Sequence, residues 1–473
     1  MAKRKLDLTD ERQSPLKVIL WLSWPLFLEQ VLSTLVSFAD TAMVGALGAT
    51  ATASVSISNS FVFLINGAVI ALGVGFTAYV ARSVGAKDYE AAKAYIRHAL
   101  LLLLIVGLPL AMLLLALHKQ IPIWMGANEE FLGLAQNYLM ITSVFRIFTM
   151  AMMVLGAVFR GRGDTKTPLR INIVVNILNV VGNYLLIHDS HTIQIHLDSL
   201  NIHWAIPMWG AGLGVQGAAL STGLSWFLGG TALAVMLFVK KDPTRISLKD
   251  SFRLDFALVK RVVKISVPAM LERLCMSLSG IVVTKSIAML GTASVAAHAV
   301  YNTAESLSFM PGFAFASAAT TLVGQALGAK KPDLAKRYNW YTVGVGIVMM
   351  ILAGLALFVF ANPLVRFINP DPAVVELAEK CLRIVAFVQP IQVVGWILAG
   401  SLRGAGDTKW PFYITALGNW MFRALGAWLC VNVFNLGLPA AVFCMCLDQG
   451  IRAICMFFRF QTGKWQYALE KKA

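Results

Sequence analysis

The sequence has little charge. Only 14% of its 473 residues are Asp, Glu, Lys or Arg, whereas 58% are apolar, and the mean hydropathy is +0.70. A globular domain typically carries about 25% charged residues. This composition therefore excludes an ordinary soluble enzyme and indicates a membrane protein.

Motifs that would indicate other functions are absent. No GxxxxGK[ST] loop occurs, so no ATPase domain is expected, and the energy for any transport would come from an ion gradient or a separate subunit. The six cysteines form no CxxC pair and have no histidine at ligand spacing, so we interpret them as reduced thiols. No nucleophile and base stand at a credible spacing. We therefore expect no enzymatic activity, no catalytic residue and no cofactor apart from a coupling ion.

Two short glycine motifs resemble functional signatures. Residues 212–217 spell GxGxxG, but they open an apolar run with no preceding strand, which favours close helix packing over dinucleotide binding. Residues 404–407 spell GxGD, but they lie in a basic connection and recur at 161–164. A helix-to-loop turn explains this motif better than a protease site.

Apolar runs of the length that a helix needs to cross a bilayer, roughly 20 residues, recur along the whole chain. They predict an all-α membrane protein with twelve transmembrane helices. The longest polar connection, at about 189–208, is too small for a soluble domain. The approximate spans are 16–39, 55–80, 97–117, 134–158, 169–188, 211–239, 259–286, 297–324, 340–361, 378–401, 411–433 and 439–460.

The basic residues alternate between the two sides of these spans. The N-terminus, the connections after even-numbered spans and the C-terminus hold 31 of the 40 Lys and Arg residues, and the opposite side holds four. Because Lys and Arg are retained on the cytoplasmic side, we expect both termini in the cytoplasm and the protein in the inner (plasma) membrane. The net charge of +16 thus indicates topology and contact with the lipid bilayer, not nucleic acid. The five remaining basic residues fall inside spans, namely Arg146, Arg273, Lys285, Arg423 and Arg452.

The chain contains an internal repeat. RGRGDTK at 160–166 recurs as RGAGDTK at 403–409, a shift of 243 residues that also pairs Pro25 with Pro268 and Glu29 with Glu272. The repeat predicts two parallel six-helix lobes, residues 1–239 and 258–473, joined by a basic cytoplasmic linker at 240–257. Such halves commonly enclose a central cavity that opens alternately to each side of the membrane.

The chain resembles the multidrug and toxic compound extrusion (MATE) transporters. The resemblance rests on the repeated RGxGDTK loops, FADTAMVGALG at 38–48, the VPAMLE run that ends at Glu272, and SLRGAGDTK at 401–409. It implies an antiporter that exports organic cations or other amphipathic small molecules in exchange for Na⁺ or H⁺. Two alternatives stay open, a flippase of lipid-linked precursors with a related fold and a non-transporting receptor or scaffold. The flippase predicts a strongly cationic central cavity.

The resemblance assigns a coupling role to several positions. Asp40 matches an acidic residue of the first helix that takes part in ion or proton coupling. Glu272 is similar to a seventh-helix glutamate of one bacterial branch, in which Gln392 stands at the position of an aspartate. A second branch has Asn and Asp on the fifth helix, where this chain has Asn179 and Asn183. Thr222 is a weaker ligand candidate by position. Because the chain departs from both patterns, Na⁺ and H⁺ both stay open.

Comparison of the two repeats indicates that Asp40 is present for function and not for the shared fold. Its partner under the shift is Val283, so the fold does not require a carboxylate there. An aspartate inside a span costs about 2.5 to 3.5 kcal/mol on insertion scales. We interpret Asp40 as a cation or proton acceptor, the alternative being an interfacial carboxylate near the outer end of the helix.

Polar residues form a single stripe on span five and another on span one. Their spacing of three and four residues places them on one helix face in each case. Carboxylate and amide oxygens suit small cations, so these faces predict a cation site with Asp40 and Asn179 as metal ligands if the ion is Na⁺. Interhelical hydrogen bonding is an equal alternative. The span-five stripe consists of Asn172, Asn176, Asn179 and Asn183.

A second set of residues is expected to line the substrate cavity. Glu29 and Glu272 are repeat partners, which leaves a structural role open for each. Glu305, His298 and Lys285 have no polar partner in the first half, although His298 also suits packing and Lys285 suits a snorkelling role. The cavity candidates are Glu29, Glu305, His298 and Gln392. Asp448 and Arg452 are expected to pair at i, i+4. We expect a monomer that binds small cationic or amphipathic molecules.

Overall fold

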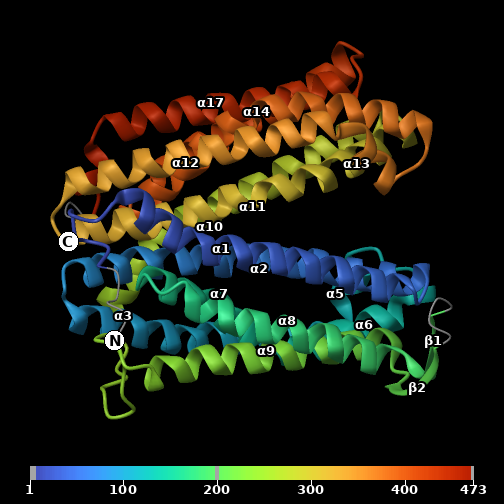
Figure 1. The fold of residues 1–473 in the computed structure, drawn as a ribbon, viewed down its shortest axis with the longest axis horizontal. Helices are drawn as coiled ribbons and strands as arrows, with labels where there is room; N and C mark the ends of the chain where they lie inside the picture. Colours follow the sequence, from blue (N-terminus) through green and yellow to red (C-terminus); the bar gives the residue numbers. More distant parts are fainter. Residues whose placement is uncertain (1–6, 198–201, 470–473) are drawn as a thin grey trace.

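The structure, a computed structural model, describes residues 7–197 and 202–469. Its helices form two bundles that lie against each other (Figure 1). The first bundle contains α1 (Pro15–Gly45), α2 (Ala49–Gly85), α3 (Tyr89–Leu102), the π-helix η1 (Leu103–Gly107), α4 (Leu108–Ala116), α5 (Gln120–Trp124), α6 (Glu129–Val144), α7 (Arg146–Gly161), α8 (Lys166–Ile187) and α9 (Gly214–Val239). The second contains α10 (Phe256–Ala288), α11 (Thr292–Gly328), α12 (Pro332–Val359), α13 (Ala361–Ile368), α14 (Pro372–Gly404), α15 (Lys409–Gly418), the π-helix η3 (Asn419–Ala424), α16 (Leu425–Trp428), the π-helix η4 (Leu429–Val433), α17 (Leu438–Gln461) and the 3₁₀-helix η5 (Lys464–Tyr467).

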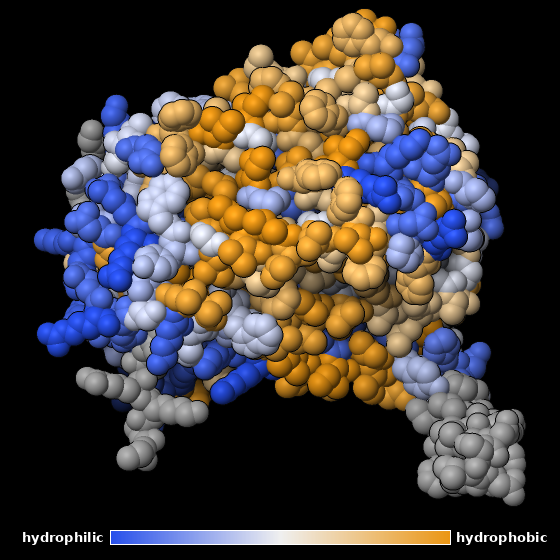
Figure 2. Space-filling model, turned by 45° about the horizontal axis from the view of Figure 1, so that its top comes forward, coloured by the Kyte–Doolittle hydropathy of each residue, from blue (hydrophilic) through white to orange (hydrophobic). Residues whose placement is uncertain are grey.

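The predicted spans correspond to helical segments. Ten helical segments in the described part of the chain are long and apolar enough to cross a membrane, one of them being the continuous run of α3, η1 and α4. The bent pair α6 and α7 is an eleventh candidate. The predicted span at 411–433 is made of four consecutive short helices, α15 to η4. Figure 2 shows a broad hydrophobic band flanked by hydrophilic residues at both ends. The fold class is therefore that of a multi-pass helical membrane protein with two lobes, as the sequence predicts.

Two spans are interrupted where polar residues enter the bundle. Helices α6 and α7 meet at Phe145 with a bend of 52°, and α7 then begins at Arg146. In the second bundle η3 contains Asn419 and Arg423. π-Helical turns of this kind are rare and frequent at functional sites. Apolar patterning predicts the length of these spans but not the breaks.

The connection between α8 and α9 contains the one sheet of the described residues. Strands β1 (Asp189–Leu197) and β2 (Ile202–Ala211) pair antiparallel, with Ile193 opposite Ile206. The sequence predicted only a polar connection here. The glycines of the GxGxxG motif follow the hairpin, and a Cβ on Gly217 would lie 2.2 Å from the Leu186 carbonyl oxygen. Close packing between α8 and α9 therefore explains that motif.

The backbone repeats with the sequence. Residues related by the shift of 243 adopt the same left-handed conformation, which places the same turns at the same points of each bundle. Equivalent hydroxyls also bond equivalent carbonyls, Thr77 to Ala157 and Thr320 to Gly400, both at 2.9 Å. The paired φ values are 105° and 94° at Gly48 and Gly291, 58° and 59° at Lys87 and Lys330, and 76° and 84° at Gly163 and Gly406.

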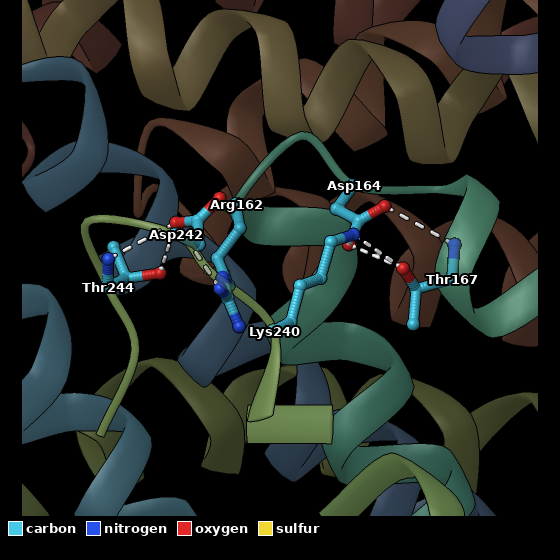
Figure 3. A network of polar contacts seen from close by, with 6 residues as sticks. All are labelled: Arg162, Asp164, Thr167, Lys240, Asp242 and Thr244. Atoms are coloured by element: carbon cyan, nitrogen blue, oxygen red, sulfur yellow. Dashed lines mark hydrogen bonds and ion pairs between the residues drawn. The ribbon is translucent and has the colours of Figure 1, made fainter. Parts of the chain in front are cut away.

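The repeated RGxGD segments are turns held by their aspartates. Asp164 accepts from the Thr167 amide at 3.2 Å and hydroxyl at 2.8 Å and pairs with Lys240, which follows α9 (Figure 3). In the second lobe Asp407 pairs with Arg459 of α17 at 2.6 Å. Each turn is thus tied to the last long helix of its own lobe. These contacts support the structural interpretation of the GxGD motif.

The two lobes meet closely at the end of the molecule where the described termini lie (Figure 1). The buried Gln325 side chain donates to the Gly161 carbonyl at 2.9 Å, and the Thr321 hydroxyl donates to the Arg160 carbonyl at 3.0 Å. Gly85 and Gly328 end α2 and α11 there, each against backbone of the other lobe. The lobes are therefore closed at this end.

Candidate functional site

A central cavity of about 1260 Å³ separates the lobes away from the closed end. It lies at the C-terminal ends of α1 and α10 and at the N-terminal end of α2, so it is reached from the end opposite the described termini. The lining combines apolar side chains with many serine, threonine and asparagine side chains. It also includes Asp40, Asn183, Thr222, Trp226 and Lys285.

Asp40 lies on the first-lobe wall of this cavity, half-buried in α1. The Asn183 amide of α8 donates to its Oδ1 at 2.5 Å. One turn away, the Asn179 amide donates to Thr222 Oγ1 of α9 at 3.1 Å. The polar faces of spans one and five therefore meet, and they bring together four of the predicted coupling residues.

Two amide oxygens of the α8 stripe accept no hydrogen bond within the described residues. Asn179 and Asn183 are 5% and 1% exposed, and the Oδ1 atom of each is buried without a hydrogen-bond partner in the described structure. Unpaired buried polar atoms are costly and require an explanation. Carboxylate and amide oxygens are the types of ligand that small hard cations prefer. The described residues contain no group of three or more His, Cys, Asp or Glu that could hold another kind of metal ion.

The two remaining asparagines of the span-five stripe lie away from Asp40. Asn172 donates to Glu29 Oε1 at 2.8 Å, an interhelical hydrogen bond. Asn176 lines neither the central cavity nor the second cavity described below. The stripe thus divides into a hydrogen bond between helices at one end and a candidate ion site at the other.

Glu29 and Glu272 occupy equivalent environments. Glu29 lies 3.7 Å from Arg160, the first residue of the RGxGD turn, and Glu272 lies 2.6 Å from the equivalent Arg403. Thr415, the equivalent of Asn172, donates to Glu272 at 3.1 Å. The shared pairing indicates a structural contribution from both carboxylates. Glu29 lines neither of the two cavities, whereas Glu272 lines the second.

The second cavity, of about 310 Å³, lies within the second lobe. Gly280 of α10 lines both cavities, so they adjoin there. Two predicted cavity residues, Glu305 and Gln392, line it, and both are buried. The predicted candidate His298 lies outside both cavities, with its ring against Tyr301 at 5.3 Å.

Sequence analysis gave no role to Arg146, although it placed this residue inside a span. The side chain is 1% exposed, donates to the Asn66 side chain and lies 5.8 Å from the ring of Trp226, a residue of the central cavity wall. Its repeat partner is the uncharged Gln389, so the shared fold does not require the Arg146 charge, just as it does not require that of Asp40. Asp448 and Arg452 do pair as predicted, at 2.9 Å.

Replacing Arg403 with Met is expected to destabilise the protein by about 3 to 5 kcal/mol, because it leaves the buried Glu272 carboxylate without its counter-charge. Adding Glu272→Gln should recover most of the loss. The thermal unfolding midpoint of the three variants measures this coupling.

The matched control is Arg383→Met on the same helix α14, where the side chain is 48% exposed and the expected change is within about 0.5 kcal/mol. A double variant as unstable as Arg403→Met alone would contradict the assignment of a buried pair.

The fold and the site define a class of protein. Two related helical lobes around a cavity, with a carboxylate inside a membrane span, are the architecture of a membrane transporter rather than an enzyme. The MatE family model matches residues 25–185 and 268–429, once in each lobe. The chain therefore belongs to the MATE family of multidrug efflux transporters.

Known proteins similar to the chain agree with this family. A probable multidrug resistance protein NorM from Thermotoga maritima is 28% identical over 460 residues, which are 95% of this chain and 93% of that protein. An FAD transporter from Shewanella oneidensis is 28% identical over 340 residues, 72% and 71% of the two chains. In fold, the chain matches an outward-facing conformation of a multidrug resistance MATE family transporter with a TM-score of 0.83, 23% identity and 98% coverage of both chains.

Proposed function

We propose that the protein exports organic cations and other amphipathic small molecules in exchange for Na⁺ or H⁺ by alternating access. The observation that carries this proposal is the Asp40 carboxylate on the wall of the cavity between the lobes, hydrogen-bonded to Asn183 of the polar stripe on α8. The Asp40 carboxylate can accept a proton or bind Na⁺, which keeps both coupling ions in the proposal.

The site supports a simple coupling scheme. In the absence of the cation, Asp40 is charged and accepts the Asn183 hydrogen bond. A proton or Na⁺ at Asp40 neutralises that charge, changes the contact between α1 and α8, and so biases the first lobe toward the opposite opening. Swinging a population from 1:99 to 99:1 needs about 5.5 kcal/mol of differential binding. Neutralising a carboxylate inside a span contributes part of this free energy.

The orientation follows from the distribution of charge. We place both termini and the linker at 240–257 in the cytoplasm and the protein, as a monomer with lobes 1–239 and 258–473, in the inner membrane. The hydrophilic end of the molecule that holds the termini supports this orientation (Figure 2). The central cavity would then open outward in this structure, with the cytoplasmic side closed.

A flippase of lipid-linked precursors is favoured less. Its anionic pyrophosphate would need a strongly cationic central cavity, yet the charged side chains that line this cavity within the described residues are Lys285 and Asp40, one of each sign. Amphipathic small molecules suit the mixed lining better. The relative named as an FAD transporter supports a substrate range that extends beyond cations.

Dye accumulation in everted membrane vesicles tests the proposal. Vesicles that contain the protein should accumulate ethidium when either an inside-acidic pH gradient or an inside-high Na⁺ gradient is imposed, and the effective gradient identifies the coupling ion. Nigericin should abolish a proton-driven signal and monensin a Na⁺-driven one. Accumulation equal to that of vesicles without the protein, under both gradients, would contradict the proposal for this substrate class.

A further inference from the structure

The second cavity differs from the central one in charge. Four arginines and two glutamates line it, so its lining is formally positive, whereas the central cavity carries one charge of each sign. The six charged residues are Glu272, Arg273, Glu305, Arg403, Arg423 and Arg452.

Ion pairs neutralise only two of the four arginines that line this cavity. Arg403 pairs with Glu272 at 2.6 Å, and Arg452 pairs with Asp448 at 2.9 Å. Arg273 and Arg423 make no hydrogen bond or ion pair with any described residue. Two guanidinium groups thus face the cavity without an ion-pair partner among the described residues, and Glu305 is the lining carboxylate that makes no ion pair.

The two unpaired arginines are not required by the repeated fold. Their partners under the shift of 243 are Gln30 and Val180, neither of them charged. Arg423 stands in the π-helix η3, and Arg273 lies on α10 beside the first lobe, where a Cβ on Gly67 of α2 would be 3.7 Å from the Arg273 Cβ. Arg423 therefore lies in a local distortion of its helix, and Arg273 lies at the boundary between the two lobes.

The unpaired buried atoms of this cavity include donors. Asn419 is 2% exposed, and neither its Nδ2 nor the Nε of Arg452 has an acceptor among the described residues. The lining also holds one acceptor without a described donor, Oε1 of Gln449. On α8 of the first lobe, by contrast, the side-chain amide atoms of Asn179 and Asn183 that lack a partner within the described residues are both acceptors. Donors together with an excess of positive charge suit an anion, because hydrogen bonds to a charged group are the stronger ones.

The same cavity has an aromatic wall. Phe313 and Trp396 stack with ring centroids 4.7 Å apart, and Phe309 contacts Trp396 edge-on at 5.1 Å. All three line the cavity. Aromatic surfaces bind planar rings through stacked or edge-on contacts. A cavity near 300 Å³ falls within the range of small-ligand pockets.

We propose that the second cavity binds aromatic organic anions, with Arg273 and Arg423 contacting the carboxylate or phosphate, Asn419 donating to it, and Phe313 and Trp396 contacting the ring. This inference rests on the proposed transport function, because it interprets the bound anion as a second class of transported substrate. The two lobes then differ in charge, with the coupling cation at Asp40 and an anion site in the second lobe.

The test uses three probes that differ mainly in charge, indole-3-acetate, neutral indole-3-acetamide and cationic tryptamine. Their binding to the purified full chain in nanodiscs is measured by isothermal titration calorimetry. Indole-3-acetate should bind most tightly. Arg423→Gln should weaken it about tenfold or more, since a hydrogen bond to a charged group contributes about 1.5 to 3 kcal/mol, and Arg423→Lys should restore part of the affinity.

A second variant separates this expectation from loss of folding. Glu305→Gln removes the opposing charge and should tighten indole-3-acetate binding severalfold, a gain that an unfolded protein cannot produce. The matched control Arg383→Gln, on the exposed face of α14, should change nothing. The inference is overturned if the wild type does not bind indole-3-acetate, if tryptamine binds more tightly, or if Arg423→Gln and Glu305→Gln both leave the affinity unchanged.

These binding measurements need no ion gradient. If the vesicles fail to accumulate ethidium while indole-3-acetate binds with the expected dependence on Arg423 and Glu305, cation export fails and the anion site remains. The reverse combination refutes the anion site alone.

Discussion

Alanine at both Gly85 and Gly328 is expected to open the lobes at the end of the molecule where the described termini lie. A Cβ on Gly85 would lie 2.0 Å from the carbonyl oxygen of Gln325, and one on Gly328 would lie 2.0 Å from that of Arg82. Both contacts are with backbone of the opposite lobe, so no rotamer change can relieve them. The added methyl groups therefore destabilise the closed arrangement and favour the one in which these helix ends separate.

Electron–electron double resonance measures this opening. Spin labels at Glu90 and Asp333, which are 79% and 94% exposed and related by the repeat, report the distance between the lobes at that end, on a background with the six cysteines replaced. The Gly85→Ala and Gly328→Ala protein should show a longer main distance than its parent.

Gly344→Ala in α12 is the matched control, because its added Cβ meets nothing within 4 Å. An unchanged distance in the double variant, with the protein folded, would contradict the role of this glycine contact in closing the lobes.

Asp40→Asn is expected to reduce ion-driven efflux to the level of vesicles without the protein. The amide keeps the shape of the side chain but has no negative charge. A proton or Na⁺ therefore has no carboxylate to bind at this position. The variant should remain folded, because removing a charge from a membrane span lowers its insertion cost. Everted-vesicle accumulation and the unfolding midpoint measure the two expectations separately.

The control for this variant is Asp333→Asn, the same substitution on an exposed side chain of α12, which should retain efflux. Full ion-driven transport by Asp40→Asn would remove Asp40 from the coupling mechanism.

Much of the fold could be predicted from the sequence because membrane spans are set by apolar length and the repeat by identical loops. The contact between α1 and α8 was also predictable, since Asp40 and Asn183 stand on polar faces of otherwise apolar helices. The bend at Phe145 and the π-helices were not, because they depend on how neighbouring helices pack. Hydropathy does not distinguish a bent span from a straight one.

The partners of the buried charges were harder to predict than their presence. The sequence identified Glu272 as a coupling candidate, but its pair is Arg403, 131 residues away, and such a pairing follows from helix rotation. Asn176 and His298 lie outside both cavities, because the same helix rotation decides which side chains of a span face a cavity. Arg273 and Arg423 were evident as charges inside spans, but their common cavity emerged only from the structure.

The central claim is that a cation at Asp40 changes which end of the molecule is open. The most direct test is the distance between spin labels at Glu90 and Asp333 in the wild type and in Asp40→Asn, as protons or Na⁺ are added without substrate. The account predicts that the coupling cation shifts the wild-type distribution toward longer distances and leaves that of Asp40→Asn unchanged. An equal response in the two proteins, or no response to either cation in the wild type, would contradict it.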